Sequence, residues 1–506
     1  MSESSDPRDV ARSGDPAPPD AQVLIAESQA QDPAVSRRAL LAQGVALAGG
    51  MLAVSSTAAA APVMAPSSAA AFGSLARGAG AASAYHMAAT TLTDEELVTA
   101  SLAPGVAGRD YLPVTVPDGA TLPFRIVDGV KVFHLIAEEF SHEFAPGLTA
   151  LCWGYNGRTP GPVIEAVEGD RVRIYVTNKL PAATSVHWHG VLVPSGMDGV
   201  AGLSQAPIQS GETFKYEFTL RQHGTFMYHS HKDEMVQIAL GMMGMFVIHP
   251  RAPERAGLRR ADRDFVLLTS EWKVPPGARR PDPLEMLEFN VFTFNGKSFP
   301  GTEALAVEQN DYVRVRLGNL SPMSHHPIHL HGHYWRVVAT DGGPIHPAGQ
   351  WPENTILVPT GTTRTMEFVA NNPGDWAIHC HMTHHTMNQM GHNGGVNMLG
   401  VKPAALDAAV HSALPEYMSM GTTGMGDMAE MGMPVPRNSI PMVGADGQYG
   451  YIDMGGILTV LKVREKLTPA TADAWYTSPR GALALAATAA ELARDGIDVT
   501  QREPTR

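Results

Sequence analysis

The feature that most constrains the fold of this chain is an internal repeat. Each copy begins with an Asn-Gly pair, continues through a segment of alternating polar and apolar residues (171–176 and 312–317), and reaches a His-x-His pair. A glycine, Gly224 in one copy and Gly374 in the other, then stands five residues before a second histidine pair. Short alternating segments between Gly, Pro and Asn turns are typical of Greek-key β-sandwiches. The sequence therefore predicts an all-β protein with one sandwich in each copy.

The histidine pairs of the repeat supply eight imidazoles, enough for a cluster of three metal ions. The pairs are His187 and His189, His229 and His231, His329 and His331, and His379 and His381. Many neutral nitrogen ligands without local carboxylates favour copper over calcium, magnesium or manganese. A single such pair is equally compatible with zinc or with ordinary surface histidines. Four pairs in register with a repeat indicate a metal cluster.

Cys380 adds a second kind of site. It lies between His379 and His381, and it is followed by His385 and Met390, while His326 offers a further imidazole upstream. Two imidazoles and one thiolate in a plane, with a weak thioether on the axis, form a blue-copper electron-transfer site. Because neighbouring side chains of a strand point to opposite faces, the cysteine can bind one metal while its flanking histidines reach others.

In this order and spacing the four segments resemble the multicopper oxidase family, over about residues 130–402. The resemblance implies two cupredoxin domains, at 130–250 and 263–402, and about four coppers per chain. The implied ligands are His326, Cys380, His385 and Met390 for the type 1 copper; His187 and His329 for the type 2 copper; and His189, His229, His231, His331, His379 and His381 for the type 3 pair. Electrons would pass from Cys380 through His379 and His381.

Aligning the two halves places a single type 1 copper in the chain. The second-half ligands His326, Cys380, His385 and Met390 fall opposite Thr184, Ser230, Met235 and Leu240. The thiolate is thus a serine in the first half. Asp198 matches the acidic residue that the family keeps near its cluster, and it is a candidate proton relay. Its alternative role is to form a turn with Gly199.

The assembly follows from the short connection between the halves, about residues 251–262. It leaves no room for a spacer domain, so the chain resembles the two-domain, small-laccase-like branch. That branch implies a homotrimer with trinuclear clusters between subunits. A cluster formed within one chain is the alternative.

The net charge and the N-terminal segment indicate which partners and which cellular location to expect. A net charge of −13 argues against nucleic acid as a partner. Arg37-Arg38, before a mildly apolar stretch in residues 1–61, resembles a twin-arginine signal and implies export to the periplasm or beyond. The acidic segment before these arginines departs from that pattern, and a tail with a chance arginine pair is the alternative. Residues 62–129 are expected to be an N-terminal extension, and Cys152 a buried thiol.

The segment 403–506 is expected to be a methionine-rich region followed by a tail. A short strand is predicted at 456–463, and a helix capped by Ser478 and ended by Gly496. The methionines either form a flexible tail or gather Cu(I), which thioethers prefer. They are Met418, Met420, Met425, Met428, Met431, Met433 and Met442.

The resemblance implies an oxidase that couples one-electron oxidation of a phenol, an aromatic amine or Cu(I) to reduction of O2 to water. A copper-sequestering protein without significant turnover and a copper nitrite reductase are the alternatives. His381 and Ser230 both count against the reductase, whose cysteine lies in the first domain without a second flanking histidine.

Overall fold

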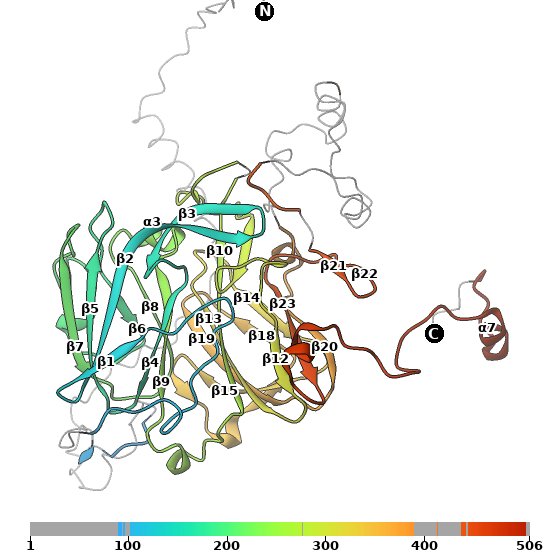
Figure 1. The fold of residues 1–506 in the computed structure, drawn as a ribbon, viewed down its shortest axis with the longest axis horizontal. Helices are drawn as coiled ribbons and strands as arrows, with labels where there is room; N and C mark the ends of the chain where they lie inside the picture. Colours follow the sequence, from blue (N-terminus) through green and yellow to red (C-terminus); the bar gives the residue numbers. More distant parts are fainter. Residues whose placement is uncertain are drawn as a thin grey trace, which may run out of the picture. The chain divides into compact units, whose positions relative to one another are not determined.

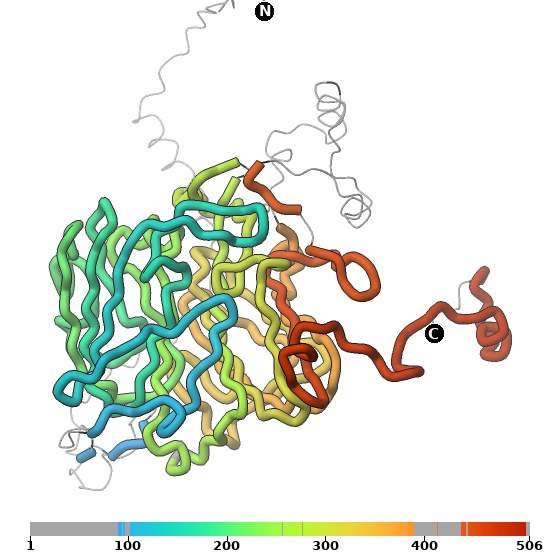
Figure 2. The backbone as a smooth tube through the Cα atoms, in the orientation of Figure 1, coloured from blue at the N-terminus to red at the C-terminus, as the bar shows by residue number. Residues whose placement is uncertain are grey.

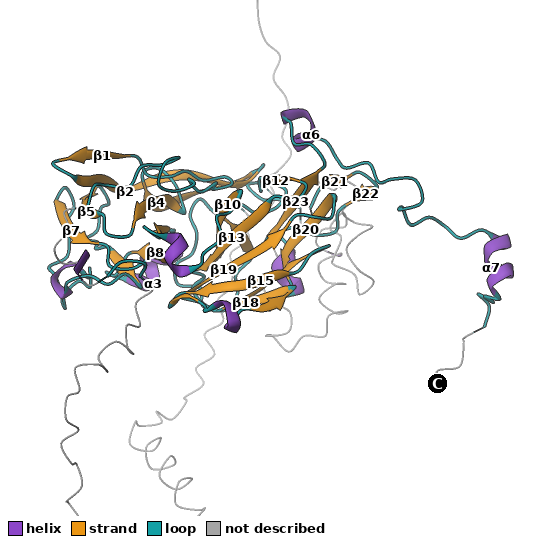
Figure 3. Cartoon of the chain, turned by 90° about the horizontal axis from the view of Figure 1, so that it is seen from below, coloured by secondary structure: helices purple, strands orange, loops and turns teal. Residues whose placement is uncertain are grey.

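The structure is a computed structural model that describes residues 90–93, 95–96, 102–275, 277–388, 412, 437–441 and 444–501. Strands make up most of the regular structure in these residues (Figure 3), which confirms the all-β class. Residues 82–506 form one compact unit that contains both copies of the repeat. Figure 2 follows the chain from the first copy, in cyan and green, to the second, in yellow and orange.

The first half of the repeat forms two sheets (Figure 1). Sheet 1 contains β1 (Phe124–Val127), β2 (Val130–Ala145), β3 (Leu148–Tyr155), β5 (Arg171–Asn178) and β7 (Thr213–Thr219). Sheet 2 contains β4 (Gly161–Val167), β9 (Met243–His249), β8 (Gly224–His229) and β6 (His187–His189), in that order. The short helices η1 (Ser195–Met197) and α3 (Glu234–Ala239) follow β6 and β8 in the chain.

The second half forms two further sheets. Sheet 3 contains β11 (Val291–Phe294), β10 (Arg263–Trp272), β13 (Tyr312–Asn319), β19 (Thr362–Val369), β15 (Trp335–Thr340), β16 (Gly343–Pro344) and β17 (Trp351–Glu353). Sheet 4 contains β12 (Leu305–Glu308), β23 (Leu458–Arg464), β20 (Gly374–Cys380), β14 (His326–Leu330) and β18 (Thr355–Val358). The helical turn η2 (Pro253–Ala256) lies in the connection between the halves, η3 (Pro347–Gly349) lies between β16 and β17, and η4 (Thr383–Thr386) follows β20.

Strand pairing confirms the repeat. β2 runs parallel to β5 as β10 does to β13, and β4 runs parallel to β9 as β12 does to β23. The antiparallel pair β6–β8 likewise corresponds to β14–β20. Asn156 and Asn295, which open the two copies, both adopt a left-handed conformation, at φ of 54° and 46°. Gly224 and Gly374 share a φ of 151°, which disfavours any residue with a Cβ.

The four sheets stack in the order of their numbers, because a separate apolar core lies between each successive pair. Trp188 belongs to the core between sheets 1 and 2, Met245 and Leu268 to the core between sheets 2 and 3, and Trp335 and Ile378 to the core between sheets 3 and 4. The middle core joins the two halves of the repeat. Fully burying a side chain of this size contributes about 1.5–3 kcal/mol, so the halves are held together firmly.

The methionine-rich region is an insertion within the second sandwich and not a segment that follows it. β23, which lies beyond the predicted domain end at residue 402, pairs with both β20 and β12 in the middle of sheet 4. It occupies the place that β9 holds in the first half. The predicted strand at 456–463 is thus confirmed, but its role in the domain was missed, because the long insertion separates it from its neighbours in sequence.

The predicted boundary between 129 and 130 falls inside a hairpin. β1 pairs with β2 on either side of it, and Thr115 forms a bridge with Phe265 of β10. Tyr111 and Leu122 are buried. The described end of the N-terminal extension therefore packs into the body of the protein.

The C-terminal helix begins later than predicted. α7 spans Ala489–Asp495 with Thr488 as its N-cap, and Gly496 ends it as expected. Ser478 does not cap it, because Thr488 and Glu491 form a capping box closer to the helix. The other elements in this region are the hairpin β21 (Asp446–Gly447) and β22 (Gly450–Tyr451), and the short helix α6 (Pro469–Asp473). Within the described residues, none of the helices has the length and apolar character needed to span a membrane.

Candidate metal centres

The structure brings His326, Cys380 and His385 together inside the second sandwich. The Cys380 Sγ lies 3.7 Å from His326 Nδ1 and 3.5 Å from His385 Nδ1, and the two nitrogens are 3.1 Å apart. All three residues are fully buried. β14 and β20 position the first two, because Ile328 pairs with Cys380 in the register of sheet 4. His385 comes from η4, immediately after β20.

Neighbouring side chains fix the orientation of the His326 and His385 rings. His326 Nε2 lies 2.6 Å from Ser321 Oγ, and the His385 ring stacks on Phe292 at 4.3 Å between centroids. Glu271 Oε1 accepts hydrogen bonds from the backbone N–H groups of Met323 and Ser324, in the loop before His326. Such outer contacts set ring orientation at metal sites. No motif or common spacing in the sequence predicts these three residues, Ser321, Phe292 and Glu271.

The first-half histidines form one group, which we call quartet 1: His187, His189, His229 and His231. The His187 ring lies 5.4–5.7 Å from the other three ring centroids, and His189 Nδ1 is 3.2 Å from His229 Nε2. His187 Nδ1 donates to the carbonyl oxygen of Asp198 at 2.8 Å, which leaves its Nε2 available as a ligand.

The second-half histidines form quartet 2: His329, His331, His379 and His381. Its layout repeats quartet 1, since the His329 ring lies 4.7–5.6 Å from the other three. His331 Nε2 and His379 Nε2 are 3.1 Å apart. His329 Nδ1 contacts the carbonyl oxygen of Asn354 at 2.9 Å, as His187 contacts that of Asp198.

Burial keeps these imidazoles in the form that binds metal. It lowers the pKa of His229 to about 3 and holds the pKa of His326 well below its usual value. It also lowers the pKa values of His189 and His379. The same burial raises the pKa of the Cys380 thiol to about 12, so a metal must displace its proton on binding.

Comparison with known proteins identifies both halves. Family models described as multicopper oxidase match residues 138–253 and 275–396. Copper resistance protein A of Pseudomonas syringae pv. tomato is 43% identical over 117 residues, which are 23% of this chain and 18% of that protein. Laccase-1 of Botryotinia fuckeliana is 34% identical over 213 residues, 40% of this chain and 37% of the laccase.

A solved structure, that of the multicopper oxidase mgLAC, is similar at a TM-score of 0.50 and 26% identity, over 68% of this chain and 88% of that one. The two family matches fall on the two sandwiches that carry quartet 1 and quartet 2. The chain belongs to the multicopper oxidase family. It spans 18% of the length of the copper resistance protein and 37% of that of the laccase.

The two quartets of this multicopper oxidase do not meet within the chain. Ile328 and Cys380 face the core between sheets 3 and 4, so His329 and His379, the next residues along their strands, lie on the outer face of sheet 4. Quartet 1 lies on sheet 2, so sheets 3 and 4 stand between the two groups. Among the described residues, ring contacts join the histidines of each quartet but none joins one quartet to the other.

Asp198 lies beside quartet 1, as the sequence predicted. Its carboxylate Oδ1 is 3.4 Å from His187 Nδ1. Asp198 also lies in a turn, because its N–H donates to the Ser195 carbonyl oxygen at 3.1 Å, and the next residue must be glycine, since a Cβ on Gly199 would come within 1.7 Å of the Val186 carbonyl oxygen. The two expected positions of this residue are therefore compatible.

In the first half, the place of the type 1 site holds a hydrogen-bonded cluster. Thr184 and Ser230 both donate to Gln237 Oε1, at 2.7 and 2.5 Å, and Gln237 Nε2 donates to the carbonyl oxygen of Ala183 at 2.9 Å. Gln237, and not Met235, fills the position opposite His385, since Met235 is 57% exposed. The alignment of the halves missed this because α3 and η4 differ in length.

The other predicted features lie outside the described residues. These are the axial ligand Met390, the Arg37-Arg38 pair and the seven methionines of the insertion. Cys152 is a buried free thiol in the core between sheets 2 and 3, as predicted.

Proposed function

We propose that this multicopper oxidase couples one-electron oxidation of a reducing substrate to the four-electron reduction of O2 to water. The observation that carries the proposal is the buried triangle of His326, Cys380 and His385, in which the cysteine belongs to the same strand as two quartet histidines.

The triangle fits a copper ion. The circle through the three donor atoms has a radius of about 2.0 Å, and zinc, a neighbouring metal, forms bonds of about 2.0–2.3 Å to imidazole nitrogen and thiolate sulfur. Two imidazoles and a thiolate are the equatorial ligands of a blue-copper site. We assign His326, Cys380 and His385, together with Met390 beyond the described residues, as the residues that would hold the type 1 copper.

The quartets fit the remaining three coppers. We assign His187 and His329 to the type 2 copper, because each is the central ring of its quartet and anchors its Nδ1 on a carbonyl oxygen. The type 3 pair would be held by His189, His229, His231, His331, His379 and His381. This gives about four coppers per chain.

Bound copper would supply one-electron redox chemistry, and storage in a cluster lets four electrons and four protons convert O2 into two waters. The protein supplies the route between the sites. Cys380 faces the core while His379 faces outward, and His379 Nδ1 donates to the Cys380 carbonyl oxygen at 2.9 Å. Covalent bonds and this hydrogen bond thus link the two. Asp198, beside His187, would orient water and hold a proton.

The proposed assembly is a homotrimer of the two-domain, small-laccase-like type, with three clusters between subunits. Two observations support it. The quartets lie on sheets 2 and 4 of one chain, and His331 and His381 are exposed on the outer face of sheet 4. A neighbouring subunit that brings its quartet 1 to this face would complete an eight-histidine cluster.

The substrate we propose is a phenol, an aromatic amine or Cu(I). The methionine-rich insertion leaves the described structure after Asn388, three residues beyond His385, and the chain that follows it passes the type 1 ligands again at Ile457, whose N–H donates to the His385 carbonyl oxygen at 3.0 Å. Its thioethers would then deliver Cu(I), which they bind in preference to harder ions. A cuprous oxidase exported by the twin-arginine route to the periplasm would protect the cell envelope.

Sequestration of copper without turnover is the second candidate, and similarity to a copper resistance protein supports it. It does not account for a blue-copper triangle on the same strand as a histidine pair. A nitrite reductase is disfavoured because Ser230 and Gln237 fill the first-half site.

The test is O2 consumption by the copper-loaded protein with 2,6-dimethoxyphenol and, separately, with Cu(I). We expect Cys380→Ser to lose the intense blue absorption and nearly all turnover while remaining folded, because the charge-transfer ligand and the electron route are gone. Ser230→Ala is the matched control in the other half and should keep the blue absorption. A blue band that survives Cys380→Ser contradicts the site, and copper binding without O2 uptake supports sequestration. Turnover of nitrite in place of O2 supports the reductase.

A further inference from the structure

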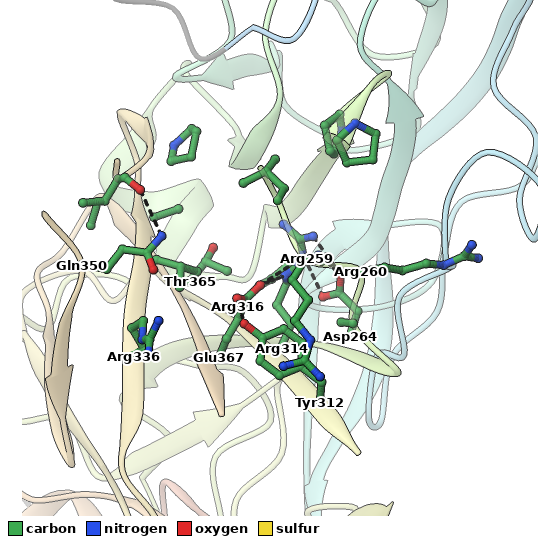
Figure 4. A pocket seen from close by; sticks show the side chains of 18 of the residues that line it. Arg259, Arg260, Asp264, Tyr312, Arg314, Arg316, Arg336, Gln350, Thr365 and Glu367 are labelled. Atoms are coloured by element: carbon green, nitrogen blue, oxygen red, sulfur yellow. Dashed lines mark hydrogen bonds and ion pairs between the residues drawn. The ribbon is translucent and has the colours of Figure 1, made fainter. Parts of the chain in front are cut away.

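A cavity of about 830 Å³ lies between the two halves, and neither the histidines of the two quartets nor His326, Cys380 and His385 line it. Its walls come from the start of β8, the end of β9, and β13, β15 and β19 of sheet 3, and residues 257–261 of the connection border it. Figure 4 shows its charged side chains. The volume falls within the range of about 300–1,000 Å³ that is usual for small-molecule sites.

A row of alternating charges crosses its floor. In the register of sheet 3, Arg336 of β15 lies beside Glu367 of β19, Glu367 beside Arg314 of β13, and Arg314 beside Asp264 of β10. Figure 4 shows the same order, with Arg336 and Arg314 on opposite sides of Glu367. Arg316 adds a further positive charge next to Asp264, to which it donates at 2.7 and 2.8 Å.

The carboxylates of Asp264 and Glu367 form ion pairs with arginines other than Arg336. Asp264 pairs with Arg316 and Arg314, and Glu367 accepts from Arg314 Nε at 2.7 Å and also from the Tyr312 hydroxyl. Arg336 is exposed to the cavity and has no ion pair or hydrogen bond with any residue that the structure describes. An excess positive charge therefore faces the cavity of a protein whose net charge is −13.

The wall also contains a buried polar group, the ring of His223. His223, which directly precedes β8, is 4% exposed and lines the cavity. Its ring makes no hydrogen bond within the described part of the chain. Buried polar groups are ordinarily hydrogen-bonded, so His223 offers a ligand contact.

Much of the remaining wall is apolar. Leu258 of the connection, Ile345 and Pro347 near β16, and Phe368 of β19 line it. An inorganic anion would leave these surfaces in contact with water. A ligand that fills the cavity needs an acidic group and an apolar body.

We propose that this cavity binds an organic anion, an aromatic or aliphatic acid whose carboxylate or sulfonate is held by Arg336 and whose apolar body packs against Leu258 and Ile345. A guanidinium presents two parallel N–H donors that match an acid group. The site is independent of the copper ligands and of the proposed oxidase activity.

The experiment is isothermal titration of the full-length protein with 2-naphthoate, and with 2-naphthamide as its neutral counterpart. We expect one naphthoate per chain and at least tenfold weaker binding of the amide. Arg336→Gln should weaken naphthoate binding at least tenfold. Arg364→Gln is the matched control, because Arg364 lies on β19 of the same sheet, pairs with Asp341, and is not part of the cavity wall.

Further variants separate the possible outcomes of the naphthoate titration. Ile345→Trp should block naphthoate with Arg336 intact, and thermal melting checks that the variants fold. Cys380→Ser should bind naphthoate as the wild type does, which separates this site from the copper chemistry. Equal affinity for the acid and the amide, or undiminished binding by Arg336→Gln, would overturn the proposal. Complete competition by inorganic phosphate at constant ionic strength would overturn its apolar part.

Discussion

At the scale of single residues, Asp198 contacts His187 in two ways that can be separated. Its main-chain carbonyl accepts a hydrogen bond from His187 Nδ1, and its carboxylate lies near the same nitrogen. Substitution by asparagine keeps the turn and the carbonyl contact, because the two side chains have the same size, but it removes the charge. A structural role of Asp198 would survive this change, and a role in proton transfer would not.

We therefore expect Asp198→Asn to lower O2 turnover by roughly tenfold to a hundredfold, the usual range for residues that support metal ligands. The blue absorption should be unchanged, since the triangle around Cys380 is remote from the substitution. Steady-state O2 uptake and the visible spectrum of the same sample measure both. Asp233→Asn, at an exposed residue before α3, is the control. Wild-type turnover in Asp198→Asn would show that the only role of Asp198 is to form the turn with Gly199.

His142 gives the fold a dependence on pH. Its Nε2–H donates to the Gly296 carbonyl oxygen at 2.7 Å, and burial lowers the pKa of the ring from 6.5 to about 4. The unfolded chain therefore binds a proton that the folded protein excludes between pH 6.5 and 4. The free energy of unfolding contributed by this group is fully present above pH 6.5 and is lost as the pH falls toward 4.

The contribution of His142 can be measured by urea unfolding of the metal-free protein between pH 7.5 and 4.5. We expect His142→Gln to be less stable than the wild type at pH 7.5. Its stability should fall less steeply on acidification, by up to about 1.4 kcal/mol per pH unit. Parallel curves for the two proteins would show that folding does not lower the pKa of His142.

At the scale of elements, β23 decides where the second sandwich ends. It lies between β12 and β20 in sheet 4, and Leu461 and Val463 are fully buried in the core between sheets 3 and 4. Removing it would leave two strand edges unpaired and the apolar core open. We expect a chain that ends at residue 402 to be insoluble or to lack native near-ultraviolet circular dichroism.

A chain that ends at Tyr476 is the matched control for this truncation. It keeps β23 and the Tyr476 N–H donation to Asp375, but it lacks α7. It should fold with an unchanged melting temperature. A soluble, cooperatively unfolding chain that ends at 402 would contradict the assignment of β23 to the sandwich.

These elements also show what the sequence can and cannot predict. The repeat is visible because Asn156 and Asn295 occupy the same left-handed turn, and because strand alternation puts each histidine pair on one face. The ligand triangle is visible because copper requires a fixed set of donors. β23 and Gln237 were missed or misplaced, because an insertion or a short helix changes the spacing on which alignment of the halves depends. The charged cavity was not foreseen, since Arg336 and His223 come together only when sheets 2 and 3 pack.

At the scale of the whole molecule, the order of the four sheets explains why quartet 1 and quartet 2 lie apart in one chain. The outer face of sheet 2 is largely covered by sheet 3 through the core that contains Met245 and Leu268, and quartet 1 lies on β6 and β8. The corresponding face of sheet 4 carries quartet 2, and no sheet in the described part of the chain lies over it. The closed ring of identical subunits proposed above would bring quartet 1 of each subunit to quartet 2 of the next.

Complementation between two inactive variants tests this arrangement. One variant carries His187→Ala and His189→Ala, which disable quartet 1, and the other carries His329→Ala and His331→Ala, which disable quartet 2. Each alone should keep the blue absorption and lose O2 turnover, because the Cys380 triangle is intact in both.

After the mixture is unfolded and refolded with copper, every mixed trimer contains one interface at which an intact quartet 1 meets an intact quartet 2. Random assembly then restores about one cluster in four, so turnover should rise to about a quarter of that of wild type refolded in the same way. Light scattering should report a trimer in each sample. A cluster closed within one chain cannot be rescued by mixing, so a mixture as inactive as its components, alongside an active refolded wild type, would show that the two halves of a single subunit form the cluster.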